Sequence, residues 1–197
     1  MAKKKMMKRA VAKKTVSKKK TTARAKRPAT RRASPIPKGL HTVTANLVLQ
    51  DTAKAIEFYK QAFGAKEITR MPGPDGRGIM HAQVKIGDSS IFMNDEQPQS
   101  TLRAPSADHK ATASIQIYVP SCDTFYARAL KAGAKEVMPM MDMFWGDRMG
   151  MLMDPFGNTW AIATHMRDLT ESQMRKAAEA FARNMPQQQT IQTQPNA

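Results

Sequence analysis

Hydrophobic and polar positions in the first half of the chain follow a strand, a helix and three further strands. Residues 43–49 are mostly apolar and suit a strand. Apolar residues then recur at helical spacing between Asp51, which suits an N-cap, and Gly64, which suits a left-handed C-cap. The three strands predicted after this helix cover residues 66–71, 78–86 and 89–95.

The second half of the chain repeats this order. The tetrapeptide Gly-Ala-Lys-Glu occupies residues 64–67 and again residues 133–136, so the two copies are 69 residues apart. Each copy follows a helical pattern, and the second helix is predicted to begin at Ser121 or Asp123. The accompanying strands are predicted at residues 113–119, 136–140, 149–154 and 158–164.

Other landmarks keep nearly the same separation, which indicates that one supersecondary unit has been duplicated. Gly76 and Gly146 are 70 residues apart, and so are Gly87 and Gly157. The sequence therefore predicts an α+β fold of two tandem βαβββ modules that form a curved mixed sheet and leave a cleft between them. The predicted modules are residues 41–96 and 111–166, within a domain that spans residues 40–168.

The C-terminal part of the chain differs from this duplicated body. Thr170 and Gln173 match a capping box, which predicts a helix over residues 169–186. Residues 187–197 are rich in glutamine and are expected to be disordered.

The charge of the chain is concentrated at its N-terminal end. Residues 1–39 carry 16 Lys plus Arg and no Asp or Glu, whereas the remaining residues carry 16 basic and 16 acidic side chains. The formal net charge of +16 therefore belongs to the first segment, which is expected to be a disordered arm. The residues expected to contact nucleic acid are Lys3, Lys4, Lys5, Lys18, Lys19, Lys20, Arg31 and Arg32.

This basic arm suits non-specific binding of DNA or RNA, because neutralised phosphates release counterions. It contains no aromatic residue, so base stacking and sequence-specific recognition are not expected. An anionic membrane surface, ribosomal RNA and a purely solubilising role stay open as alternatives.

Cysteine content and hydropathy give information about the cellular compartment of the protein. Cys122 is the single cysteine, so no disulfide can form within the chain, and we expect it to be an ordinary structural residue. No run approaches about 18 apolar residues, so no transmembrane helix is expected. The basic N-terminus lacks the apolar segment of a secretory signal. We expect a cytoplasmic protein, with nucleoid association and an organelle transit peptide as open alternatives.

Short motifs in the duplicated body resemble those of the vicinal oxygen chelate superfamily, which includes glyoxalase I, bleomycin resistance proteins and extradiol dioxygenases. Leu-Val-Leu-Gln-Asp at residues 47–51, with Ile-Glu-Phe-Tyr at 56–59 and Phe-Gly-Ala at 63–65, is similar to the first module of that family. Asp-Pro-Phe-Gly-Asn at residues 154–158 resembles its closing turn. Asp-Met-Phe-Trp-Gly-Asp-Arg at residues 142–148 resembles the glyoxalase-like subgroup named after phosphonate-operon protein B, also labelled demethylubiquinone-methyltransferase-like.

The resemblance implies half-barrel modules around a ligand pocket and frequent homodimers. In metal-dependent members, His and Glu side chains, two from each module, hold a divalent cation. The corresponding positions in this sequence are Thr44, Ile91 or Phe92, Ser114 and Ala161. None of these is a His or a carboxylate, so we expect no four-ligand site, no cofactor and no ordinary glyoxalase I activity. A divalent metal held in another way stays the alternative.

Polar and aromatic side chains on the predicted strands are candidates for the pocket. His81 and Gln83 share one strand face. His81 could be a general base or a lone metal ligand, or it could be a half-exposed strand histidine. Trp145 and Arg148 could stack on and clamp a ligand, or they could pack and pair within the turn. The full set comprises the catalytic candidates His81 and Arg148 and the pocket candidates Thr44, Gln83, Phe92, Ser114 and Trp145.

Methionine is unusually frequent, with 16 in the chain. Seven of them crowd one region, where they could fill the core or form a deformable pocket wall. The two histidines outside the predicted pocket, His109 and His165, are expected to be solvated. The crowded methionines are Met138, Met140, Met141, Met143, Met149, Met151 and Met153.

These observations predict a small-molecule-binding protein or enzyme of the glyoxalase and bleomycin-resistance type. An enzyme of this kind would be of lyase, isomerase or dioxygenase type. The alternative is a nucleic-acid-associated protein with a histone-like tail, in which the folded domain serves dimerisation. The two hypotheses are compatible, because the arm could place the folded body near nucleic acid.

Overall fold

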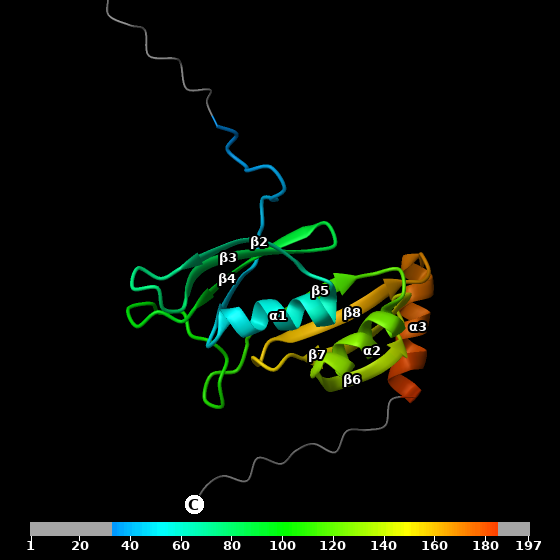
Figure 1. Ribbon diagram of the computed structural model, residues 1–197. Helices are drawn as coiled ribbons and strands as arrows, with labels where there is room; N and C mark the ends of the chain where they lie inside the picture. The colour runs from blue at the N-terminus through cyan, green and yellow to red at the C-terminus, as the bar shows by residue number, and fades with distance from the viewer. Residues whose placement is uncertain (1–32, 185–197) are drawn as a thin grey trace, which may run out of the picture. The chain divides into compact units, whose positions relative to one another are not determined.

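The computed structural model describes residues 33–184. The eight basic residues expected to contact nucleic acid and the glutamine-rich tail lie outside this range. Residues 35–184 belong to one compact unit, and all contacts described below lie within it. The described part of this unit contains two four-stranded mixed sheets and three α-helices (Figure 1). The fold is therefore α+β, as the sequence predicts.

The first module has the predicted order of one strand, one helix and three strands. Its elements are β1 (Asn46–Leu49), α1 (Thr52–Phe63), β2 (Lys66–Pro72), β3 (Ile79–Ile86) and β4 (Ser89–Asp95). The strands form a first sheet in the order β1-β4-β3-β2, in which only β1 and β4 are parallel. The strand β1 is shorter than predicted, so Thr44 precedes it.

The second module repeats this topology. Its elements are β5 (Ser114–Tyr118), α2 (Cys122–Ala132), β6 (Lys135–Asp142), β7 (Asp147–Met153) and β8 (Thr159–His165). They form a second sheet in the order β5-β8-β7-β6, again with one parallel pair, β5 and β8. The capping-box helix follows as α3 (Glu171–Asn184). The shared strand order supports the duplication.

Local side-chain chemistry explains where the first two helices begin and end. The Asp51 carboxylate accepts a hydrogen bond from the Lys54 backbone N–H at 2.9 Å, which caps α1. Gly64 ends α1 with φ +66°, and Gly133 ends α2 with φ +112°, a conformation that favours glycine. Of the two N-caps predicted for α2, the structure selects Ser121, although its hydroxyl makes no capping bond.

A buried carboxylate joins the two modules. Asp154, in the turn between β7 and β8, is 2 % exposed. It accepts hydrogen bonds from the Tyr59 hydroxyl at 2.6 Å and from the Trp160 indole at 2.9 Å. It also accepts bonds from the backbone N–H groups of Phe156 and Asn158. Because Tyr59 belongs to α1, this one side chain fixes the closing turn of the second module against the first.

Aromatic stacking and one arginine join the two helices. The Phe63 ring of α1 stacks on the Phe125 ring of α2, with centroids 5.7 Å apart and planes 6° apart. The Arg128 guanidinium lies over Phe125 at 4.7 Å and donates to the Ala62 carbonyl at 2.8 Å. The carbonyl at the end of α1 is therefore satisfied by a side chain from the other module.

Each sheet has one face against its own helix and one outer face. In the first sheet, Ala82 and Val84 are buried toward α1, so alternation places His81 and Gln83 on the outer face. In the second sheet, Leu152 and Trp160 are buried in the same core as the two helices. The outer face of the second sheet carries methionines, which form a separate small core with Phe181 of α3.

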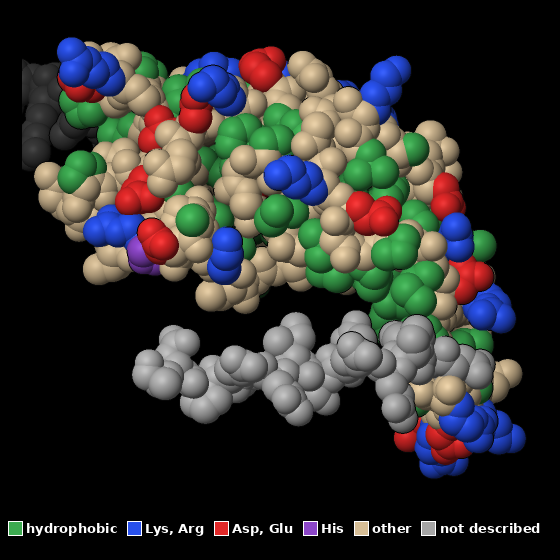
Figure 2. Space-filling view, turned by 90° about the horizontal axis from the view of Figure 1, so that it is seen from below, with side chains coloured by type: hydrophobic (Ala, Val, Ile, Leu, Met, Phe, Trp, Pro, Cys, Tyr) green, Lys and Arg blue, Asp and Glu red, His purple; other side chains and the backbone are tan. Residues whose placement is uncertain are grey.

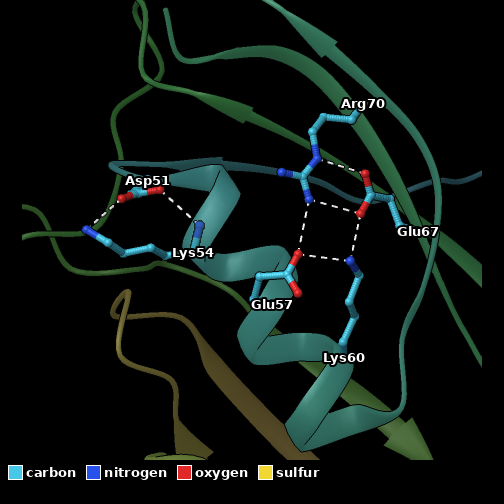
Figure 3. Close-up of polar contacts among 6 residues, drawn as sticks. All are labelled: Asp51, Lys54, Glu57, Lys60, Glu67 and Arg70. Atoms are coloured by element: carbon cyan, nitrogen blue, oxygen red, sulfur yellow. Dashed lines mark hydrogen bonds and ion pairs between the residues drawn. The ribbon is translucent and has the colours of Figure 1, made fainter.

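Charged side chains of both signs are interspersed on the surface shown in Figure 2. On α1 and β2 they form a network in which Lys60 and Arg70 each contact both Glu57 and Glu67 (Figure 3). Hydrogen bonds from Arg70, then from Lys60, lower the pKa of Glu67 to about 2. The neighbouring pair Asp51 and Lys54 is separate from it. These pairs are largely solvent-exposed, so they contribute little to stability.

No helix in residues 33–184 is long and apolar enough to span a bilayer.

The buried carboxylate should dominate the stability of the body. Replacing Asp154 by Asn keeps the volume but turns an amide NH₂ toward the Tyr59 and Trp160 donors. We expect Asp154→Asn to lower the free energy of unfolding by about 2–4 kcal/mol, measured by urea denaturation. The surface variant Glu57→Gln is the control and should cause a much smaller loss. Equal losses in the two variants would contradict a central role for Asp154.

Candidate functional site

The outer face of the first sheet brings three predicted site residues together. His81 on β3 and Phe92 on β4 meet edge to face, with ring centroids 5.0 Å apart. Gln83 lies opposite Phe92 in the sheet register and donates from its amide to the Ser90 hydroxyl at 3.0 Å. These side chains are half-buried, and they form a polar and aromatic surface that a ligand can contact.

The register also decides which residues occupy the positions of the family's metal ligands. Phe92 is opposite Asn46 on β1, as Ala161 is opposite Gln116 on β5, whereas Ile91 points into the helix-side core. Phe92, and not Ile91, therefore corresponds to Ala161 when the two sheets are compared. Of the other two positions, Thr44 donates to the His41 carbonyl at 3.4 Å, and Ser114 lies exposed at the start of β5.

Hydroxyl, phenyl and methyl groups at these four positions do not fit a divalent cation, which prefers imidazole and carboxylate ligands. Across residues 33–184, no three His, Cys, Asp or Glu side chains gather in a way that could hold a metal ion.

A cavity of about 620 Å³ lies where the first module meets the edge strand β5. One wall comes from the β3–β4 hairpin and the residues before β1, and the other from β5 and the helix residues Phe63 and Phe125. The cavity is mainly apolar, with a polar edge formed by hydroxyl and amide groups. Its lining residues are Val43, Ala45, Phe63, Ile86, Gly87, Asp88, Ser89, Ser90, Ile91, Ile115, Gln116, Ile117, Tyr118, Val119 and Phe125.

None of the seven predicted site residues lines this cavity. Thr44, Phe92 and Ser114 are each adjacent in sequence to a residue that lines it. Ser90 connects the cavity to the outer face of the first sheet through its bond to Gln83. The signal that sequence reasoning missed is the alternation of β5, where Ile115 and Ile117 form an apolar stripe on an edge strand.

Arg148 lies on the helix side of the second sheet. Its guanidinium donates to Asp123 of α2 at 2.8 and 2.9 Å and to Asp142 of β6 at 3.0 Å. The hydrogen bonds from Arg148 lower the pKa of Asp123, and the two carboxylates raise the pKa of Arg148. Of the two alternatives for Arg148, this geometry favours pairing within the fold.

Asp147 is the centre of a second polar cluster. The carboxylate is 4 % exposed and accepts from the Tyr118 hydroxyl at 2.8 Å and from the Trp145 indole at 3.0 Å. Its other oxygen lies 2.7 Å from Nδ1 of His165. Burial raises the pKa of Asp147, but the hydrogen bonds from His165, Tyr118 and Trp145 outweigh burial and lower it. Tyr118 links this cluster to the cavity, which its ring lines.

His165 is solvent-exposed, as expected, and it also has carboxylate partners. Nδ1 contacts Asp147, and Nε2 lies 3.0 Å from Asp168, so both ring nitrogens have carboxylate partners. Hydrogen bonding to Asp147, and then to Asp168, raises the pKa of His165. His109 lies in the exposed loop between the modules, as expected.

The two tandem βαβββ modules, with a cavity at their junction, define a paired-module α+β protein. The chain belongs to the Glyoxalase/Bleomycin resistance protein/Dioxygenase superfamily, which it matches over residues 39–162.

Two individual proteins are also similar to this chain. The chain is 36 % identical over 138 residues to an uncharacterized protein of Mycobacterium bovis, a match that covers 68 % of this chain and 90 % of the relative. The crystal structure of TioX from Micromonospora sp. ML1 is similar with a TM-score of 0.52 and 25 % identity, over 62 % of this chain and 97 % of TioX.

A putative 3-demethylubiquinone-9 3-methyltransferase, the PhnB protein from Bacillus cereus, is similar in fold. Its TM-score is 0.50 at 16 % identity, over 63 % of this chain and 99 % of that protein.

The His165 cluster predicts a pH dependence of stability. A raised pKa in the folded state stabilises the protein below the unfolded value near 6.5, and this contribution is lost as the pH rises through the folded pKa. We expect His165→Gln to lower the melting temperature more at pH 6 than at pH 9. Thermal melts of both proteins across this range measure the difference, and a loss independent of pH would contradict it.

Proposed function

We propose that this protein binds an apolar small molecule in the cavity at the module junction. The observation that carries the proposal is the cavity itself, about 620 Å³ in volume and enclosed by side chains from both modules. A pocket of this size fits the range of small-molecule sites. Membership of the superfamily and the polar edge of the cavity support the same conclusion.

The cavity lining points to the chemistry of the ligand. Isoleucine, valine and phenylalanine side chains favour an apolar body, while Ser89, Ser90, Gln116 and Tyr118 offer hydrogen bonds at one edge. Asp88 is the one charged residue among the described lining residues. We therefore propose a neutral or cationic ligand, because an anion would meet a carboxylate and no basic partner there.

The proposed site works without the four-ligand metal centre of metal-dependent family members. The side chains at Thr44, Phe92, Ser114 and Ala161 do not suit a metal, so no step is assigned to one. If the protein also converts its ligand, we propose His81 as the residue that exchanges a proton with it. His81 lies on the outer face of the first sheet, so the ligand would have to extend past Ser90 to reach it.

Filling the cavity should abolish binding. Replacing Ile117 by Trp adds a bulky ring to the cavity wall, so we expect the affinity for the neutral probe Nile red to fall at least about tenfold. Fluorescence titration measures the affinity, and circular dichroism checks the fold. Val137→Trp is the matched control, because Val137 lies exposed on β6, away from the cavity. Unchanged affinity in Ile117→Trp would refute this site.

Thermal-shift screening should first identify a metabolite that binds. Titration with that metabolite, together with an assay for its chemical conversion, then separates binding from turnover. His81→Ala should then remove turnover while leaving affinity for the metabolite largely intact. Arg148→Ala should lower stability through the loss of its two carboxylate partners. A parent protein that binds the metabolite and leaves it chemically unchanged would show a sequestering role.

A second proposed function is non-specific association with nucleic acid through residues 1–39. The observation that favours it is the confinement of the whole net charge of +16 to this segment, while the rest of the chain is neutral. The folded body would then serve dimerisation, so that two arms act together. The arm lies mostly outside the described residues, and its sequence alone supports this proposal.

The arm should bind duplex DNA with a steep salt dependence. If about 8 phosphates are neutralised, the logarithm of the affinity should change with the logarithm of salt concentration with a slope near about −7. Gel-shift titrations of the full chain and of residues 40–197 measure it. Equal mobility shifts for the two proteins at low salt would contradict the proposal that residues 1–39 bind nucleic acid.

A further inference from the structure

A second cavity, which we call the linker cavity, lies where the loop between the modules meets the closing turn of the second module. Its volume is about 320 Å³. One wall comes from residues 105–107 and 110 of the loop, and the other from residues 153–157 of the β7–β8 turn. Gln50 and Lys135 complete the lining. The linker cavity and the junction cavity share no lining residue, so they are separate sites.

The start of the loop is packed firmly on the folded body. A side chain at Gly157, which has φ +84°, would bring its Cβ within 2.8 Å of the Cβ atom of Pro105. Glycine at this turn therefore allows the loop and the turn to approach closely. The preceding loop residue, Ala104, is buried, and its backbone N–H donates to the Glu96 carboxylate at 2.9 Å. The loop wall of the cavity is thus held in place before any ligand binds.

A tight turn orders the next residues of the loop. The backbone N–H of Ser106 donates to the His109 carbonyl at 2.7 Å. The Ser106 hydroxyl oxygen accepts from the backbone N–H groups of Asp108 at 3.3 Å and His109 at 3.1 Å. Both bonds use the oxygen as an acceptor, so the O–H group can still donate to a ligand. The turn ends directly before Lys110 and so fixes the backbone that carries this lysine.

Two lysines line the cavity, Lys110 on the loop and Lys135 at the start of β6. Both are solvent-exposed. The lysines that form ion pairs within residues 33–184 are Lys54 and Lys60, so no described carboxylate neutralises the two cavity lysines. An anionic ligand can therefore contact both ammonium groups without first breaking an ion pair.

The one carboxylate in the lining, that of Asp154, does not cancel this preference. It is 2 % exposed, and its oxygens already accept from Tyr59, Trp160 and two backbone N–H groups of the turn. With two lysines and one carboxylate, the lining has a net charge of +1 (2 − 1). The junction cavity has the opposite sign, because Asp88 is the charged residue among its described lining residues.

Apolar side chains form the rest of the lining. They can contact a ring or a short hydrocarbon chain, and they leave the lysines to bind a charged group. The volume of the cavity is at the lower end of the range for small-molecule sites, so the ligand is small. The apolar lining residues that matter for this contact are Pro105, Met153, Pro155 and Phe156.

We propose that the linker cavity binds a small organic anion. Its carboxylate or phosphate group contacts Lys110 and Lys135 and accepts from the Ser106 hydroxyl, while its apolar part packs against Phe156 and the neighbouring prolines. The proposal goes beyond the function proposed above, because it concerns a separate site and a ligand whose charge does not suit the junction cavity.

Lysine footprinting tests the site in the full chain, with phenyl phosphate as the probe. Brief acetylation with acetic anhydride, followed by peptide mass spectrometry, reports the reactivity of each lysine. Saturating phenyl phosphate should slow acetylation of Lys110 and Lys135 at least about threefold, because bound ammonium groups are shielded. Lys66 is the internal control, since it is exposed, occupies the place of Lys135 in the first copy of the repeat and lies outside the cavity. Benzyl alcohol, which has a ring and no charge, should protect none of them.

Affinity measurements on variants give a second test. The double variant Lys110→Gln with Lys135→Gln should bind phenyl phosphate at least about tenfold more weakly in isothermal titration calorimetry, because two charge-assisted contacts are lost. Lys66→Gln removes the same charge elsewhere and should bind like the parent protein. Circular dichroism checks that the fold is kept. The affinity of the double variant for Nile red should be unchanged, because the junction cavity is untouched.

Three outcomes would overturn the proposal. Equal protection of Lys66 would show a general attraction of anions to basic side chains. Unchanged affinity in the double variant would refute the linker cavity as the site. Loss of phenyl phosphate binding in Ile117→Trp would place the probe in the junction cavity. Failure of the junction-cavity proposal is seen separately, as unchanged binding of Nile red to Ile117→Trp.

Discussion

The hydrogen bonds to Asp154 are the constraint on which the rest of the structure depends. The carboxylate is held by its own turn and by the tyrosine of α1, so the closing turn of one module becomes part of the core of the other. A buried charge of this kind is tolerated only when its acceptor capacity is filled. The junction cavity has walls from both modules, so its shape depends on how the two modules pack together.

Duplication has produced two sheets with the same topology and different outer surfaces. The outer face of the first sheet carries half-buried polar and aromatic side chains, while that of the second carries methionines, against which Phe181 of α3 packs. The four positions where metal-dependent members place ligands carry none of the side chains that a divalent cation prefers. The lining of the junction cavity offers mainly apolar contact, together with hydroxyl and amide groups.

Most of the fold could be predicted from the sequence, because its signals are local. Asp51, Gly64 and Gly133 mark helix ends through their own backbone chemistry, and the repeat reveals the topology. The candidate site was harder to predict than the fold, because its composition depends on which face of each strand points toward the core. Along β7 the methionines alternate with Gly150 and Leu152, so both faces are apolar and alternation could not show that Arg148 points to α2. The junction cavity is lined by residues far apart in sequence, and Asp147 lies 18 residues before its partner His165, so no local pattern predicts either feature.

The stacked pair Phe63 and Phe125 has a consequence for how the molecule responds to heat and to occupancy. Each ring belongs to a different half of the duplicated body, and both rings form part of the cavity wall. A ligand in the cavity would contact both rings, so its binding would stabilise both modules together. The halves should accordingly lose their structure in one cooperative transition, and a bound guest should shift that transition as a whole.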